Sequence, residues 1–307
     1  MRIGVPDMVS NSYFPAIAAV DLGAFQAEGV DAEVELVYPV PKAMEALREG
    51  ELDFVAGSAH ATLTAFPNWD GAKLLVALAQ HMYWFLVLRS DLCAKRGDIN
   101  AIKGLKIGAA PGPDKGLVGL LTEAGIDLER DEVTVAPVPG VLEPGISFGV
   151  HAAKSLEAGL IDGFWANGMG TEVAVRSGAG TVVLDVRRGD GPPAARGYTF
   201  PALVASDIKI KENPNEVAAA IRALVRVQKT LRENPARARE VGVLRFPSTE
   251  AELIAELIER DLPYYDPYIS KTSVNQMNRF AGNIGLLSKS VSYEQVVATQ
   301  FRELWAV

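Results

Sequence analysis

The chain has 307 residues, of which 49% are hydrophobic and 22% are charged, and its formal net charge is −8. These values are ordinary for a globular protein of one or two domains, and a negative charge without any long run of Lys or Arg argues against nucleic acid as a partner. A single cysteine, Cys93, excludes an internal disulfide and a cysteine-based metal centre, and no segment has the roughly 18 uninterrupted apolar residues needed for membrane insertion.

The first part of the chain alternates between short apolar runs and segments with helical spacing. We expect three pairs of a strand and a following helix, at 2–6 and 15–25, 32–38 and 41–49, and 53–57 and 59–66. Two more apolar strands follow, at 74–79 and 84–89. Strands that alternate with helices are typical of a mostly parallel α/β sheet.

The middle of the chain repeats this alternation, and the last third is helical. A second set of strands and helices is expected at 106–110, 114–124, 133–138, 149–158, 161–166 and 181–186. A turn-rich break at 189–193 precedes a strand at 198–205. Helices are then expected at 215–233, 249–261, 273–281 and 293–305, and we predict that they pack around the first of two lobes.

A motif that occurs twice indicates a duplicated architecture. The sequence Leu47-Arg48-Glu49-Gly50-Glu51-Leu52-Asp53 is matched by Leu156-Glu157-Ala158-Gly159-Leu160-Ile161-Asp162, and an apolar strand follows each copy. Gly29-Val30-Asp31 is matched by Gly125-Ile126-Asp127 in the same order. We therefore predict an α/β fold of two Rossmann-like lobes with a central cleft and two hinge crossings. Lobe 1 would comprise residues 1–84 and 202–307, including the C-terminal helices, and lobe 2 would comprise residues 85–201.

Five motifs taken together resemble one known family. They lie at 23–31, 47–57, 104–108, 156–165 and 285–287. In this order and spacing the chain resembles the bacterial type II periplasmic solute-binding proteins, in the branch that includes sulfonate-, nitrate- and thiamine-pyrimidine-precursor-binding proteins. The resemblance implies that a small organic ligand binds in the cleft, that no cofactor is needed and that an ABC transporter permease is a partner. It covers almost the whole chain, but it does not name the ligand.

Polar and aromatic side chains follow the predicted strands of lobe 1. At this edge the strands end and the next helices begin, so that free backbone N–H groups and the positive ends of helix dipoles attract polar or anionic ligands. The candidate ligand-binding residues from lobe 1 are Ser10, Asn11, Tyr13, Phe14, Ser58, His60, Gln80 and His81. A structural role stays open for each, such as a helix cap for Ser10 or Asn11, a core position for Phe14, or a bond from a histidine to a backbone carbonyl.

Lobe 2 supplies candidates for the opposite wall of the cleft. Gly112 and Asp114 belong to a loop rich in Gly and Pro that opens a helix, and Trp165, Asn167 and Met169 follow a strand. Trp165 is our first choice for stacking on a ring, with support of a loop as the alternative role. Tyr198, near the second crossing, is expected to line either the cleft or the hinge. We therefore predict a ligand that carries a ring or an anionic group.

No catalytic or metal-binding pattern stands out. The chain has no Ser-His-Asp order, no metal-spaced His and Glu set, no Walker loop and no dinucleotide fingerprint, and Cys93 lies away from the predicted cleft. An enzyme on the same scaffold, of the lyase or decarboxylase type acting on a small aromatic or carboxylate substrate, stays open as an alternative, with His60 or His81 as acid or base. Met1-Arg2 leads directly into the first strand, which indicates a cytoplasmic protein as written, or a periplasmic one whose signal peptide has been removed.

Overall fold

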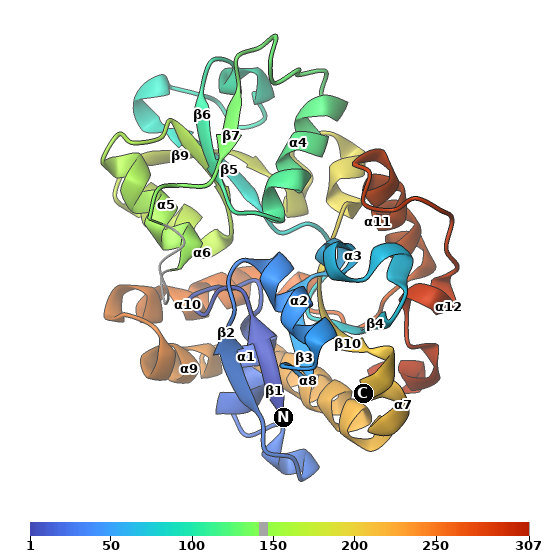
Figure 1. Cartoon of the computed structure of the whole chain (residues 1–307). Helices are drawn as coiled ribbons and strands as arrows, with labels where there is room; N and C mark the ends of the chain where they lie inside the picture. Colours follow the sequence, from blue (N-terminus) through green and yellow to red (C-terminus); the bar gives the residue numbers. More distant parts are fainter. Residues whose placement is uncertain (141–146, 307) are drawn as a thin grey trace.

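The computed structural model describes residues 1–140 and 147–306, and these form two five-stranded sheets that are covered by helices (Figure 1). The first sheet has the order β2-β1-β3-β10-β4 and contains β1 (Arg2–Val5), β2 (Glu33–Leu36), β3 (Phe54–Ser58), β4 (Ala72–Ala77) and β10 (Pro201–Ser206). The second has the order β7-β6-β8-β5-β9 and contains β5 (Phe85–Arg89), β6 (Lys106–Ala109), β7 (Thr134–Ala136), β8 (Gly163–Ala166) and β9 (Gly180–Asp185). The predicted fold of two α/β lobes is confirmed, and we call the units built on these sheets lobe 1 and lobe 2.

The two sheets share one topology. In each sheet the first three strands in the order run parallel, whereas the fourth is antiparallel to both of its neighbours. This antiparallel strand is in both cases the first that the chain forms after it crosses between lobes, β5 in lobe 2 and β10 in lobe 1. Residues 78–84 and 186–200 make the two crossings. The domain boundaries given above stay a prediction.

The repeated motif has the same structural role in both lobes. Gly50 and Gly159 follow α2 (Val40–Glu49) and α5 (Phe148–Glu157) with φ of 77° and 70°, a left-handed conformation that glycine adopts without strain. The carboxylate of Asp53 then accepts the backbone N–H of Arg2 at 2.8 Å, and that of Asp162 accepts the N–H of Lys106 at 2.9 Å. Each aspartate therefore ties its own strand to the start of the neighbouring strand.

Each sheet is covered mainly by the helices that connect its own strands. The other helices between strands are α1 (Phe14–Asp21), α3 (Thr62–Ala65), α4 (Pro113–Glu123) and α6 (Gly168–Arg176). The long helix α8 (Pro214–Glu233) buries its apolar face against α1 and β4, as its spacing predicts. The buried Gln228 of this helix donates from Nε2 to the carbonyls of Ala77 and Leu78, so it anchors the start of the first crossing.

The C-terminal helices differ from the expectation in two respects. They are α7 (Asp207–Glu212), α9 (Arg237–Arg245), α10 (Ser248–Asp261), α11 (Lys271–Asn283) and α12 (Tyr293–Val296). They do not pack around lobe 1 alone, because α10 contacts α6 and Phe280 of α11 lies against Gly119 of α4. The helix expected at 293–305 is interrupted, since the N–H of Ala298 bonds the carbonyl of Leu74 at the edge strand β4, and a 3-10 turn (Thr299–Trp305) follows.

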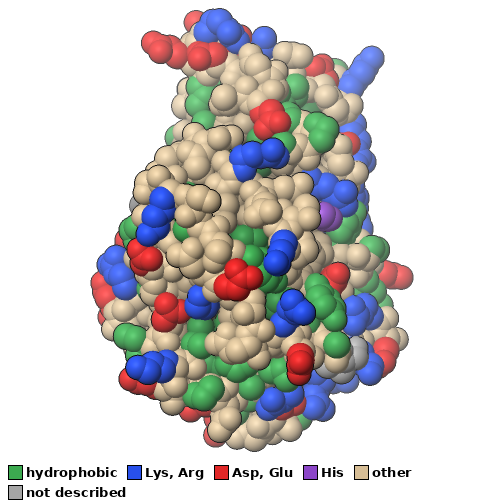
Figure 2. Space-filling model, turned by 90° about the vertical axis from the view of Figure 1, so that its right-hand side faces the viewer, with side chains coloured by type: hydrophobic (Ala, Val, Ile, Leu, Met, Phe, Trp, Pro, Cys, Tyr) green, Lys and Arg blue, Asp and Glu red, His purple; other side chains and the backbone are tan. Residues whose placement is uncertain are grey.

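The molecular surface carries charges of both signs. On the face shown in Figure 2, Lys and Arg side chains alternate with Asp and Glu, and the described residues there form no continuous basic area. None of the described helices is both long enough and apolar enough to cross a membrane.

Candidate functional site

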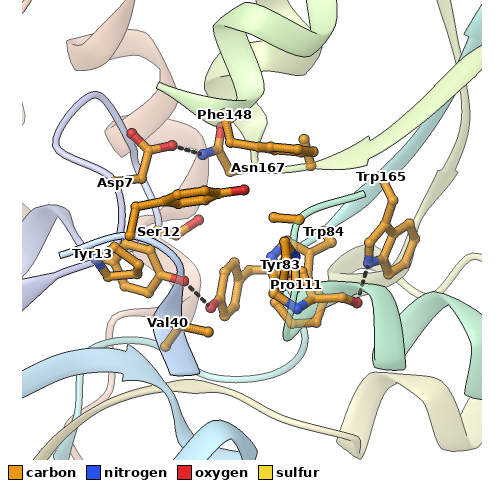
Figure 3. Close-up of a pocket in the computed structure, with 15 residues that line it drawn as sticks. Asp7, Ser12, Tyr13, Val40, Tyr83, Trp84, Pro111, Phe148, Trp165 and Asn167 are labelled. Carbon is orange, nitrogen blue, oxygen red and sulfur yellow. Dashed lines mark hydrogen bonds between the residues drawn. The ribbon is translucent and has the colours of Figure 1, made fainter. Parts of the chain in front are cut away.

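A cavity lies between the lobes, beyond the carboxyl ends of β1, β6 and β8 (Figure 3). The empty space among its lining atoms is about 430 Å³, which includes space open to solvent, and only about 40 Å³ of it can hold the centre of a water molecule. Its described lining residues are Pro6, Asp7, Ser12, Tyr13, Tyr38, Val40, Tyr83, Trp84, Ala110, Pro111, Pro113, Phe148, Trp165, Ala166 and Asn167. Both lobes and the first crossing contribute to this lining, and the predicted central cleft is therefore present as a cavity between the lobes.

Asp7 is a buried acid in the cavity wall. It follows β1 and is only 6% exposed. Its Oδ1 accepts the N–H of Val9 at 3.0 Å, and its Oδ2 accepts Nδ2 of Asn167 and Oγ of Ser147, both at 3.2 Å. Burial raises the pKa of Asp7 to about 7, because these bonds compensate only in part for lost hydration. The carboxyl group is therefore partly ionised near neutral pH.

Aromatic rings form most of the remaining wall. The hydroxyls of Tyr13 and Tyr83 bond each other at 2.9 Å, with their rings edge to face at 5.9 Å between centroids. Trp84 lies 4.9 Å from Tyr83 and 6.0 Å from Trp165, measured between ring centroids. Trp165 donates from Nε1 to the carbonyl of Pro113 at 3.1 Å, which orients its ring, and Figure 3 shows Asp7 and Trp165 at opposite ends of the set. Such a wall suits a ligand with a ring.

Two buried hydroxyls of the lining have no partner among the residues that the structure describes. They are Oγ of Ser12 and the phenol oxygen of Tyr38. Burial raises the pKa of Tyr38 above its usual value, with smaller contributions from Asp7 and Asp114, so this phenol stays protonated and able to donate. Buried polar groups are nearly always bonded, and these two hydroxyls are therefore available to a ligand.

Two of the helix starts near the cavity are satisfied by side chains of the chain itself, whereas the starts of α1, α2 and α5 have no side-chain cap. Oδ1 of Asn167 caps α6 by accepting the N–H groups of Met169 and Gly170 at 3.1 and 3.2 Å. At the start of α4, Oδ1 of Asp114 accepts the N–H groups of Gly112 and Lys115 at 2.8 and 2.9 Å. These two helix starts thus already hold a carbonyl or carboxylate oxygen.

Hydrogen bonds beside the cavity join the two lobes. Asn11 of lobe 1 donates from Nδ2 to Oδ2 of Asp261 at 2.6 Å and accepts the N–H of Met169 in lobe 2 at 3.2 Å. Asn167 of lobe 2 also donates to Oγ of Ser10 in lobe 1 at 3.2 Å. Four of the residues expected to bind ligand are thus brought together, but Ser10, Asn11 and Met169 hold the lobes closed and do not line the cavity.

Other candidates from lobe 1 lie outside the lining. Phe14 packs edge to face on Phe246, with 6.3 Å between centroids, in the core. Ser58 is fully buried at the end of β3. Nε2 of His60 lies 3.3 Å from the carbonyl oxygen of Gly112, and burial lowers the pKa of His60 to about 4.

The candidates at the two crossings also pack against their surroundings. Nε2 of Gln80 donates to the carbonyls of Asp266 and Tyr268, both at 2.8 Å. His81 faces the ring of Tyr264, and its pKa is lowered to about 4 by burial and then by Arg196 and Arg187. Tyr198 stacks on Phe280, with 4.2 Å between centroids.

Of the predicted residues, Tyr13, Trp165 and Asn167 belong to the described lining, and Gly112 and Asp114 lie close by at the start of α4. Sequence reasoning missed Asp7, Ser12, Tyr38, Tyr83, Trp84 and Phe148. Asp7 carried a usable signal, because it directly follows the first strand, where the cleft was expected. The rings of Tyr83 and Trp84 carried none, since a crossing segment has no periodicity from which its inner side can be read.

Cysteine and metal chemistry find no support at the cavity. Cys93, the only cysteine of the sequence, is exposed and lies after β5, outside the lining. Among residues 1–140 and 147–306, no group of His, Cys, Asp and Glu side chains is arranged to hold a metal ion.

Comparison with known proteins gives structural matches only. No family model matches the sequence, and no curated protein matches it. Among solved structures, the periplasmic nitrate-binding protein NrtA from Synechocystis PCC 6803 is similar with a TM-score of 0.74 and 14% identity, over 99% of this chain and 87% of that one. The alkanesulfonate-binding protein SsuA from Xanthomonas axonopodis pv. citri, solved with bound MOPS, gives a TM-score of 0.70 and 15% identity, over 98% and 96% of the two chains.

One enzyme is also similar. A mutant of DszB in complex with biphenyl-2-sulfinic acid matches with a TM-score of 0.65 and 16% identity, over 98% of this chain and 97% of that one. At these identities the matches establish the fold and not the function. The chain therefore has the two-lobed fold of the type II periplasmic binding proteins, as its repeated motifs predict.

Proposed function

We propose that the chain is the substrate-binding component of an ABC import system and captures a small ring-bearing organic molecule between its lobes. The observation that carries this proposal is the interlobe cavity, walled by aromatic rings, with two buried hydroxyls that have no partner among the described residues. A concave, mostly apolar site with a few polar groups is typical of small-molecule binding. Its structural neighbours include two proteins named for binding nitrate and alkanesulfonate.

Two further parts of the proposal rest on those neighbours. A permease would be the protein partner, and the chain would act on the outer side of the membrane, because both of these neighbours are binding proteins and NrtA is described as periplasmic. Loss of uptake of a bound compound in cells that lack this chain, with recovery on re-expression, tests delivery separately from binding.

A thermal-shift screen of small aromatic compounds, followed by mass analysis of each hit, tests binding directly. A ligand of the native state raises Tm by mass action, and we expect hits to be recovered unchanged. Conversion of a hit would instead support the enzyme alternative, with the Asp7 carboxyl as its acid or base. A screen in which no compound raises Tm would contradict the proposal.

The variant Tyr38→Phe tests whether a compound found in the screen binds in the cavity. The variant removes a buried hydroxyl without a described partner, so the Tm of the unliganded protein should stay the same or rise. A ligand that bonds this hydroxyl should bind about three- to tenfold more weakly, as measured by calorimetry. Tyr268→Phe, which alters a tyrosine that is 47% exposed and outside the lining, is the matched control and should bind like the wild type.

A further inference from the structure

The described cavity wall contains one acidic side chain and no basic one. Asp7 is the only Asp, Glu, Lys, Arg or His among the described lining residues. Residues 141–146, which lie outside the described part, include Glu143 but no Lys, Arg or His. A sulfonate or carboxylate placed here would therefore meet a carboxyl group without a compensating cation, an arrangement that is strongly unfavourable in a buried site.

Some of the other sources of positive potential near the cavity are already engaged. The start of α4 holds the carboxylate of Asp114, and the start of α6 holds the side chain of Asn167. At these two helix starts an anion would have to displace the chain's own oxygens. The guanidinium of Arg187 lies 5.6 Å from the Tyr83 ring centroid and does not line the cavity. Its Nη1 is paired with Asp261 at 3.2 Å, and its Nε and Nη2 have no partner among the described residues.

The rings of the wall favour a positive charge. Tyr13, Tyr38, Tyr83, Trp84, Phe148 and Trp165 all line the cavity. The faces of aromatic rings attract cations, most strongly where water is excluded. Figure 3 shows Asp7 on the same side of the cavity as Tyr13, opposite Trp165. A carboxylate together with aromatic faces is a site for an organic cation, whereas an anion finds no charge partner among the described lining residues.

We propose that the ligand is an organic cation, a ring-bearing molecule with a protonated amine or amidine, whose charged group lies at Asp7 and whose ring lies among Trp84, Trp165 and Phe148. This inference rests on the proposed binding function and adds the chemical class of its ligand. The hydroxyls of Ser12 and Tyr38 then supply oxygen acceptors for the remaining N–H groups.

The charges around Asp7 predict how binding depends on pH. The titratable groups that face it are the phenols of Tyr13 and Tyr38, which stay neutral because burial raises their pKa, and its bonded neighbours Ser147 and Asn167 do not titrate. A bound cation favours the ionised carboxyl, so binding lowers the pKa of Asp7 from about 7 and releases a proton. Affinity should therefore rise with pH up to about pH 7 and then level off, whereas an anionic ligand would bind more tightly as the pH falls.

Three indole compounds with similar side chains provide the test. Tryptamine is cationic, tryptophol is neutral and indole-3-propionate is anionic, and calorimetry measures their affinities from about pH 6 to about pH 8, a range over which the tryptamine ammonium stays ionised. At the upper end we expect tryptamine to bind about tenfold or more tighter than tryptophol, with indole-3-propionate the weakest. Tryptamine binding should release protons. Calorimetry detects this release as a heat of binding that varies with the ionisation enthalpy of the buffer.

Asp7→Asn should remove the preference for tryptamine and its pH dependence, while tryptophol binding shows that the variant still folds. Asp70→Asn, at an exposed aspartate remote from the cavity, is the control and should retain both. Tighter binding of indole-3-propionate or tryptophol than of tryptamine would overturn the cationic class while the binding function stands. Failure of all three compounds to bind would count against the binding function as well.

Discussion

At the scale of single residues, the unusual feature is a carboxyl group buried between two lobes without a cationic partner. Asp7 accepts three hydrogen bonds, yet burial still dominates and raises its pKa from 3.8 to about 7. The native state therefore binds a proton at Asp7 more tightly than the unfolded chain does. Such groups reduce stability and are commonly kept where a ligand uses them.

Stability should accordingly depend on pH through Asp7. Because the folded pKa is raised, the contribution of Asp7 is fully present below about pH 4 and is lost as the pH rises to about 7. Asp7→Asn removes this loss, so the unliganded variant should exceed the wild type in unfolding free energy by about 2–4 kcal/mol above pH 7, with the difference shrinking towards pH 4. Chemical denaturation at several pH values measures it.

The difference in unfolding free energy between the wild type and Asp7→Asn reports on Asp7 alone, because groups that titrate in both proteins cancel. His60 acts in the opposite sense, because its lowered pKa of about 4 makes stability fall as the pH drops below 6.5, and it does so in both proteins. A stability difference that is the same at every pH would show that the Asp7 carboxyl titrates normally.

At the scale of elements, lobe 2 depends on a close contact between two helices. A Cβ atom added to Gly170 of α6 would lie 2.3 Å from the carbonyl oxygen of Gly149 in α5, closer than real Cβ atoms come to any atom. This approach places α5 and α6 so that Phe148 and Asn167, at their respective starts, both reach the cavity. Glycine at these positions therefore serves packing and, through packing, the site.

Gly170→Ala should separate α5 from α6. Because the added methyl group meets backbone and not a flexible side chain, we expect a loss of about 1–3 kcal/mol in unfolding free energy, together with weaker ligand binding. Gly282→Ala in α11 is the matched control, since the nearest atom to its new Cβ lies 3.9 Å away, and it should be neutral or slightly stabilising. Equal stability of the two variants would contradict the packing role.

At the scale of the whole molecule, two lobes joined by two crossings enclose the cavity and meet through polar contacts, among them the ion pairs of Arg176 with Glu256 and of Arg260 with Glu172, and through buried apolar side chains. Ser147 of lobe 2 bonds both Asp7 and the carbonyl of Val9, and Arg188, at the start of the second crossing, bonds Asp261 at 3.2 Å. Two-lobed proteins of this kind close around ligands by hinge motion. The arrangement seen here is the closed one, and we expect ligand to favour it.

Small-angle scattering measures this closure. We expect the radius of gyration to decrease when a ligand from the screen is added, because the unliganded lobes separate when the interlobe bonds open. Ser147→Ala removes two of these bonds, and it should bind the ligand about threefold more weakly while its unliganded form is the more expanded.

Ser177→Ala provides the comparison and should bind ligand as the wild type does, because its hydroxyl bonds only within lobe 2, to the carbonyl of Ala174 and the N–H of Ala179, among the described residues. A radius of gyration that does not change with ligand in any of the three proteins would rule out hinge closure.

The sequence by itself determined the duplicated fold. Short apolar strands, left-handed glycines at helix ends and aspartates that tie neighbouring strands are local or nearly local features, and each recurs in order in Leu47-to-Asp53 and Leu156-to-Asp162. Periodicity and turn chemistry report on such features because they act within a few residues. It also indicated the edge of each sheet where side chains meet, and Tyr13, Trp165 and Asn167 do lie in the cavity wall.

Only the tertiary structure decided which side chains face the cavity and what charge they carry. Phe14 turns into the core beside Phe246, and His81 faces Tyr264 at the crossing, while Asp7 and Trp84 face inward. These directions depend on how two lobes, built from segments up to about half the chain apart, come together, and no local pattern encodes that. The polarity of the cavity is likewise a property of the assembled lobes, because Asp7 of lobe 1 meets Ser147 and Asn167 of lobe 2 there.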